Sequence, residues 1–291
     1  MNHESTTNPY LDLARLHEEA AASYPSNQLY CLVDHAGMPG LHRQLLRSQV
    51  RWISLFEGSK EEAALEVAPL LFALDGDGAQ PVAHLRKWVS EHGTYTSSLL
   101  LLSSPLAINE LGNALARRTQ AKVSEDMDVL LRYFDPRVFE ALVEVLTPGQ
   151  RQAYLCVADC WWYPNRRGEL VRQAAVFEPT DIFEAPLLMS AEQEFALLDR
   201  SEIDQVASQL EGLLPEQYMQ FGLARRHDFL LRHINHAKAA GIDATHELSI
   251  YCGLALLHGD DFAALPAWQT LMADVRDKKI SFIDAVAAVD E

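Results

Sequence analysis

The sequence predicts an α/β N-terminal part followed by an all-α C-terminal part. Short apolar runs alternate with helical stretches as far as about Phe177, and almost only helical periodicity follows Ala191. The 291 residues leave room for one large domain or two modest ones. We therefore expect residues 1–180 to form a mixed or mainly parallel sheet with flanking helices, and residues 190–291 to form a helical lobe.

Four apolar runs of the first part have the length and the boundaries of buried strands. They are Leu29–Val33, Pro69–Leu74, Ser98–Leu102 and Val129–Phe134. The second run leads into a turn at Asp75-Gly-Asp-Gly78, which is far more typical of a tight turn than of a calcium loop. The fourth run ends at Asp135-Pro136, where Asp135 is well placed to cap the next helix.

Helical spacing, with apolar residues at i, i+3, i+4 and i+7, marks Leu106–Arg118 and Val138–Leu146 in the first part. In the second part it predicts five helices. They cover Phe195–Leu214, Pro215 to about Gly241, Thr245–Leu257, Pro266–Val275 and Ser281–Val289. Two prolines, Pro179 and Pro186, interrupt regular structure between the parts and place the boundary within Glu178–Ser190.

The net charge of the chain limits the classes of partner that we expect it to bind. Asp and Glu number 41 against 24 Lys and Arg, a net charge of -17 that repels phosphate backbones and anionic lipids. We expect protein partners, with no nucleic acid and no membrane. The N-terminus does not read as a secretory signal, and no apolar run approaches the roughly 20 residues of a membrane span. Four scattered cysteines fit reduced thiols, so a cytoplasmic location is expected.

Three common catalytic or nucleotide-binding motifs are absent from the sequence. The chain has no nucleophile elbow, no phosphate-binding loop and no dinucleotide fingerprint, and we expect no cofactor. Five histidines fall in the helical part, and His233 and His236 share a helix face that could chelate a metal with a carboxylate. The alternative of a small cytosolic metal-dependent hydrolase stays open on these residues. Surface or capping histidines, with no metal site, are the favoured interpretation.

Two features suggest contacts with other proteins. Arg43, Arg47 and Arg51 recur every four residues, so one helix face could receive an acidic partner segment. Arginines that are solvated or paired with the chain's own carboxylates are favoured over this. Trp161-Trp162-Tyr163 places three large rings in sequence. Adjacent side chains cannot all face one core, so we expect at least one ring to be exposed or to line the junction of the lobes. Exposed Trp and Tyr are frequent interface anchors.

Several segments together resemble a known family. They are Tyr30-Cys-Leu-Val-Asp34, Trp52-Ile-Ser-Leu-Phe-Glu-Gly58 with Ala64-Leu-Glu-Val-Ala-Pro69, Ser103-Ser-Pro105, and Tyr133-Phe-Asp-Pro-Arg-Val138. Their order and spacing are similar to those of the adaptor chaperones of bacterial type VI secretion, which carry a domain of unknown function. The resemblance covers roughly Leu29 to Tyr163. It departs from the family at His35 and at Val123–Met127, where family members tend to have other turn residues.

The resemblance implies a non-enzymatic adaptor that binds a toxic effector and helps load it onto the VgrG spike, with or without a PAAR-type tip. The α/β lobe would meet the shared spike machinery, and the helical lobe would grip the cargo. Within the motifs, Trp52, Phe56, Glu57, Asp135 and Arg137 are interpreted as structural. Arg137 lies in the first turn of the helix that begins at Pro136, where a positive charge has no favourable interaction with the helix dipole. We therefore expect Arg137 to pair with a carboxylate, Glu57 or Asp34.

Overall fold

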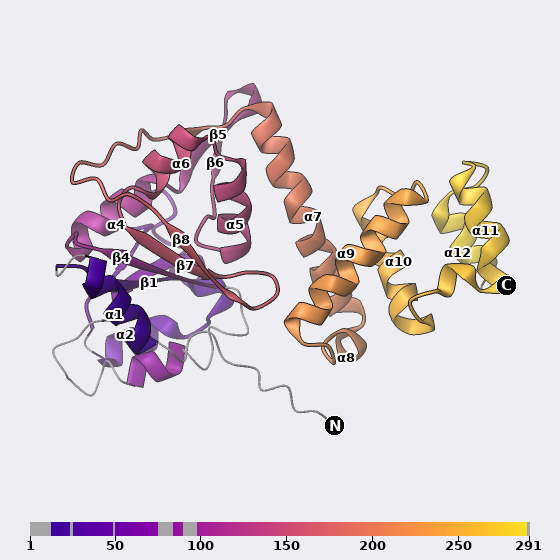
Figure 1. Ribbon diagram of the computed structural model, residues 1–291, viewed down its shortest axis with the longest axis horizontal. Coiled ribbons are helices and arrows are strands. Elements are labelled where there is room, and N and C mark those ends of the chain that lie inside the picture. The colour runs from indigo at the N-terminus through magenta and orange to yellow at the C-terminus, as the bar shows by residue number, and fades with distance from the viewer. Residues whose placement is uncertain (1–12, 24–25, 49, 75–83, 90–97, 290–291) are drawn as a thin grey trace. The chain divides into compact units, whose positions relative to one another are not determined.

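The chain divides into two compact units, residues 1–197 and residues 198–291, each with a hydrophobic core of its own. The computed structural model describes residues 13–23, 26–48, 50–74, 84–89 and 98–289 (Figure 1). The turn expected at Asp75–Gly78 lies outside these residues. An α/β unit followed by a helical unit confirms the predicted order of fold classes. No helix in the described part of the chain is long and apolar enough to cross a membrane.

The first unit is built on a six-stranded sheet with the order β2-β3-β1-β4-β7-β8. Its strands are β1 (Gln28–Asp34), β2 (Trp52–Ser54), β3 (Pro69–Ala73), β4 (Leu99–Ser104), β7 (Cys160–Pro164) and β8 (Leu170–Ala174). Every neighbouring pair in it is antiparallel, so the expectation of a mainly parallel sheet is wrong.

The strand order explains this difference. Strands β3 and β4 run in the same direction, yet β1 lies between them and is antiparallel to both. Alternating strand and helix patterns in a sequence indicate that helices connect strands. They do not indicate that an earlier strand separates the two that are connected.

The central strands of this sheet are buried on both faces. Successive residues of a strand point to opposite faces, and all residues of β4 and β7 are buried. Trp161 and Tyr163 lie against Phe139 of helix α5, with ring centroids 5.2 and 5.3 Å apart. Trp162 points to the other face and is also buried. Of the two expected positions, exposure of a ring is therefore wrong, because the unit has a core on each side of the sheet. A position at the junction of the lobes stays a prediction.

Helices of the first unit connect and cover these strands (Figure 1). They are α1 (Leu13–Ser23), α2 (Leu41–Ser48), a turn of helix over 84–89, α4 (Ile108–Arg117), α5 (Pro136–Val145) and α6 (Pro148–Leu155). The helices expected over Leu106–Arg118 and Val138–Leu146 are thus confirmed as α4 and α5.

A second, three-stranded sheet has the order β6-β5-β9. Its strands are β5 (Gln120–Val123), β6 (Met127–Leu130) and β9 (Leu187–Leu188). The run Val129–Phe134, predicted as one buried strand, contributes only its first two residues to β6. Beyond them the backbone turns toward the cap of α5, and the apolar side chains of Tyr133 and Phe134 are buried in the core without being part of a strand.

The second unit consists of helices. They are α7 (Ala191–Leu213, which begins in the first unit), α8 (Pro215–Tyr218), α9 (Leu223–Ala239), α10 (Thr245–His258), α11 (Pro266–Arg276) and α12 (Phe282–Val289). The single helix expected from Pro215 to Gly241 is interrupted at residues 219–222, where Gly222 has an extended backbone and begins α9. The ring of Tyr251 lies in the core against Phe262 and Phe282.

The burial of β7 predicts a large cost for truncating Trp161. We expect Trp161→Ala to lower the free energy of unfolding by about 3–5 kcal/mol, because it leaves a cavity beside Phe139. Urea unfolding followed by circular dichroism measures this change. Val176→Ala, at a side chain that is 63% exposed, serves as the control and should change little. Equal effects of the two substitutions would contradict the buried position of β7.

Candidate functional site

The segments that carry the motifs meet in the first unit. The buried rings of Phe56 and Phe134 lie edge to face with centroids 6.3 Å apart, which joins the Trp52–Gly58 segment to the Tyr133–Val138 segment. Trp52 is half-buried in β2. The Leu55 N–H donates to the Pro69 carbonyl at 2.9 Å, so the loop after β2 is also fixed to the start of β3.

The charged residues of these motifs pair differently from what was expected. Asp135 caps α5 as predicted, accepting a hydrogen bond from the Arg137 N–H at 2.9 Å. The guanidinium of Arg137 turns back to the same carboxylate, with Nε to Oδ1 at 3.0 Å and Nη2 to Oδ2 at 2.6 Å. Asp34 instead accepts from Arg132 at 2.6 Å. The expected carboxylate partner of Arg137 is therefore confirmed, but it is Asp135, the cap of the same helix, and the two candidates Glu57 and Asp34 are wrong.

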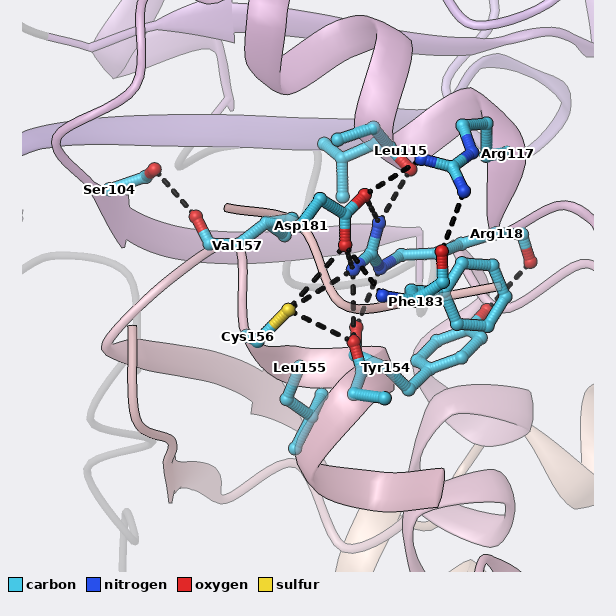
Figure 2. A network of polar contacts seen from close by, with 12 residues as sticks. Ser104, Leu115, Arg117, Arg118, Tyr154, Leu155, Cys156, Val157, Asp181 and Phe183 are labelled. Carbon is cyan, nitrogen blue, oxygen red and sulfur yellow. Dashed lines mark hydrogen bonds and ion pairs between the residues drawn. The ribbon is translucent and has the colours of Figure 1, made fainter. Parts of the chain in front are cut away.

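A buried arginine, which the motifs did not reveal, is the centre of a polar network in the first unit (Figure 2). Arg118 follows α4 and its side chain is fully buried. Its Nη1 and Nη2 donate to the two carboxylate oxygens of Asp181 at 3.0 and 2.8 Å. The same guanidinium donates to the carbonyls of Ala114, Ala153 and Tyr154 at 2.7 to 3.0 Å. Such complete pairing is what makes a buried guanidinium tolerable.

The network shifts the acidity of the groups around it. Burial raises the pKa of Asp181, but hydrogen bonds from Arg118 and its positive charge outweigh burial, so that the pKa lies below its usual value. Burial raises the pKa of the Cys156 thiol, whose sulfur lies 3.6 Å from Arg118 Nη2 and 3.5 Å from Asp181 Oδ1. A thiol with a raised pKa is a poor nucleophile. The network therefore has the properties of a structural tie, which Arg117 extends by donating to the Phe183 carbonyl at 2.6 Å.

The predicted arginine cluster is divided by the end of a helix. Arg43 and Arg47 lie on the exposed side of α2, whereas Leu41 and Leu45 are buried on its other side. Helix α2 ends at Ser48, so Arg51 is exposed but does not share this helix face, and the prediction of three arginines on one face is wrong. Leu46, which is 63% exposed, lies on the exposed side with the two arginines. We call Arg43, Leu46 and Arg47 the α2 arginine surface.

The arginines of this surface have no acidic partner within the described residues. Of the two favoured interpretations, the exposed positions of Arg43 and Arg47 fit solvated arginines, whereas pairing with the chain's own carboxylates is not seen among the described residues. Arg47 lies in the last turn of α2, where its charge interacts favourably with the helix dipole. Arg43 gains no such interaction.

The histidines of the second unit are arranged differently from a metal site. His233 is fully buried, and its Nε2 lies 3.3 Å from Asp260 Oδ1, whereas Asp260 Oδ2 pairs with Arg232. The rings of His233 and His236 are 5.9 Å apart. Burial lowers the pKa of His233, and the hydrogen bond and negative charge of Asp260 offset part of this lowering. In the part of the chain that the structure describes, no three His, Cys, Asp or Glu side chains are grouped so that they could hold a metal ion.

A cleft of about 620 Å³ opens beside the small sheet. The loop after β2, the end of α4, and strands β5 and β6 supply most of its lining. The charged lining residues are Glu57, Lys60, Glu61, Arg117 and Asp128. Glu57, interpreted from the sequence as structural, is exposed and has no ion pair within the described residues. Glu57 is therefore part of the lining of the cleft.

Comparison with protein families matches part of the first unit. Residues 29–153 match the family described as Domain of unknown function (DUF4123). The chain carries a DUF4123 domain. The match includes the motif segments from Tyr30 to Val138, the α2 arginine surface and most of the lining of the cleft. Comparisons with curated proteins and with solved structures gave no significant match.

The Arg118–Asp181 pair predicts a stability that depends on pH. We expect Asp181→Asn to lower the free energy of unfolding by about 3 kcal/mol at pH 7, because Arg118 is left buried without a counter-charge. Because the folded-state pKa of Asp181 is lowered, this difference should be complete above pH ~4 and shrink as pH falls through that pKa.

Urea unfolding between pH 7 and pH 3 measures both effects. Asp126→Asn is the control, because Asp126 is exposed and, among the described residues, forms an ion pair with Lys122 only. A difference between wild type and Asp181→Asn that stays constant down to pH 3 would contradict the assignment.

Proposed function

We propose that this protein is a non-enzymatic adaptor chaperone of a type VI secretion system. It would bind a toxic effector in the cytoplasm and help load it onto the VgrG spike, with or without a PAAR-type tip. The resemblance of its motif segments to that family supports the proposal, and these segments coincide with the DUF4123 domain. The observation that carries it is the α2 arginine surface, which has the chemistry of a protein-binding site.

This surface combines three features of a protein-binding site. Arginine is enriched at interfaces, because its planar fork binds carboxylates through two hydrogen bonds. Arg43 and Arg47 have no ion pair with a described residue, although the chain carries 41 acidic residues. Leu46 adds exposed apolar area on the same side of the helix. An acidic partner segment with apolar residues would match this combination, and we assign it to the spike protein.

The helical unit is proposed to hold the effector. Large apolar side chains on three of its helices are exposed, and they are Leu213 of α7, Leu231 of α9 and Leu257 of α10. Their exposed fractions lie between 49% and 69%. Exposed apolar area of this kind suits a partner that is not yet folded or that buries the surface on binding. The division into an α/β part for the spike and a helical part for the cargo follows the expected domains, 1–180 and 190–291.

Purification of the tagged protein from its own bacterium tests the function as a whole. Recovery of a VgrG-like spike protein, or of a toxin encoded nearby, would support the adaptor function and would name the cargo. Recovery of neither under conditions that activate secretion would contradict it.

The α2 arginine surface predicts a specific loss. We expect Arg43→Glu with Arg47→Glu to abolish recovery of the spike protein, because the two carboxylates repel an acidic segment. Recovery of the effector should remain, since its proposed site lies in the other unit. The measurement is the ratio of spike to bait in the purified complex.

The matched control is Arg151→Glu with Arg172→Glu. These two exposed arginines lie on α6 and β8 of the same unit, and their reversal changes the net charge equally. Equal losses from both pairs would mean that net charge, rather than the α2 surface, governs binding.

A further inference from the structure

The small sheet has an open edge. In the order β6-β5-β9, strand β6 pairs with β5 on one side and with no described strand on the other. The outer side of an edge strand presents backbone donors and acceptors, and a strand of another chain can pair with them. The direction in which each backbone group of β6 points therefore decides what this edge can bind.

A hydrogen bond just beyond β6 fixes these directions. The Leu131 N–H donates to the Thr119 carbonyl at 2.7 Å, and these residues continue the antiparallel register of β5 and β6. In such a ladder, opposite pairs alternate between bonded and non-bonded. Val129 therefore faces β5 with its backbone groups, whereas Asp128 and Leu130 direct their N–H and C=O groups away from β5.

The far side of β5 confirms this alternation. Lys122, which lies opposite Asp128, uses its carbonyl to accept from the Met189 N–H at 3.0 Å on the β9 side. Its backbone thus points away from β6, as the alternation requires. The backbone groups of Asp128 and Leu130 have no hydrogen-bond partner among the residues that the structure describes.

The open edge borders the cleft of about 620 Å³, because Asp128, Val129 and Leu130 line it. A strand added beside β6 would therefore bring side chains to the cleft. Of the three acidic residues in the lining, Glu61 pairs with Lys60 at 3.6 Å, and the other two are available to a ligand. Glu57 has no ion pair with a described residue, and Asp128 has only Lys122 at 3.9 Å. Of the two cations in the lining, Arg117 is held by Asp181 and the Phe183 carbonyl.

We propose that an extended segment of the spike protein, carrying Lys or Arg, pairs with β6 as a fourth strand and places its basic side chain beside Glu57 and Asp128. The unpaired backbone groups require an extended segment, and the acidic groups of the cleft require a cation. The spike is the source because both features lie within the DUF4123 domain, assigned above to the shared machinery. The inference rests on the proposed function and adds a second contact of opposite charge to the α2 arginine surface.

Proline at position 130 tests the backbone pairing directly. Leu130→Pro removes one outward N–H, and an edge strand tolerates proline where that N–H does not face its neighbour. We expect about tenfold weaker binding of the full-length spike protein encoded in the same genome, from the lost hydrogen bond and the blocked edge. Leu130→Ala is the matched control, because it removes the same side chain and keeps the N–H. It should bind as wild type does.

Two further measurements complete the test. Glu57→Lys should weaken binding, and the loss should grow as the salt concentration is lowered. Residue-resolved amide hydrogen exchange of the wild-type protein should show fast exchange at Asp128 and Leu130 and protection of both when the spike protein is added. The exchange experiment needs no variant, so it decides the question if Leu130→Pro fails to fold.

The outcomes separate the inference from the proposed function. Wild-type binding of the spike with no protection at Asp128 and Leu130 would overturn the fourth strand and leave the adaptor function standing. Equal losses from Leu130→Pro and Leu130→Ala would also overturn it, since the side chain would then be the contact. Failure of the wild-type protein to bind the spike would overturn this inference, and recovery of neither the spike nor a toxin would overturn the proposed function as well.

Discussion

The arrangement of the first unit depends on the burial of one charge pair. Arg118 joins the end of α4 to carbonyls of α6 and to Asp181, which lies 63 positions further along the chain. A guanidinium in that position would be very costly without all of these acceptors. The acceptors can gather only if α4, α6 and the segment around Asp181 are already in register. The pair can therefore form only when these segments are correctly assembled. By itself, a buried ion pair is weak evidence for stability.

The same pair positions the small sheet. Asp181 and the Phe183 carbonyl, held by Arg118 and Arg117, lie a few residues before β9, which begins at Leu187. Strand β9 has only two residues, which is too short to place itself by its own ladder. Once the 181–183 segment is held, β9 pairs with β5 and closes that side of the sheet. With β9 in place, β6 is the edge of this sheet that stays without a described neighbour.

Sequence reasoning succeeded where a local pattern has one physical outcome. The runs Leu29–Val33 and Pro69–Leu74 lie in β1 and β3, and Asp135 caps α5. It failed where the outcome depends on distant residues. Trp162 is buried because the second face of the sheet is covered, and that is invisible in a three-residue pattern. Arg118 looks like the polar end of a helix, and nothing near it in the sequence points to Asp181.

The candidate sites also depend on contacts and boundaries that a local sequence pattern does not contain. Four-residue spacing correctly brought Arg43 and Arg47 together, but it extended the helix to Arg51 because spacing alone does not give the end of a helix. Glu57 was interpreted as structural because it stands in a motif with Phe56, whose ring is buried against Phe134. Its carboxylate is exposed instead. Within one short motif, then, the ring of Phe56 is buried and fixes the loop, whereas the side chain of Glu57 is exposed. Such a division can be recognised only when the burial of each side chain is known.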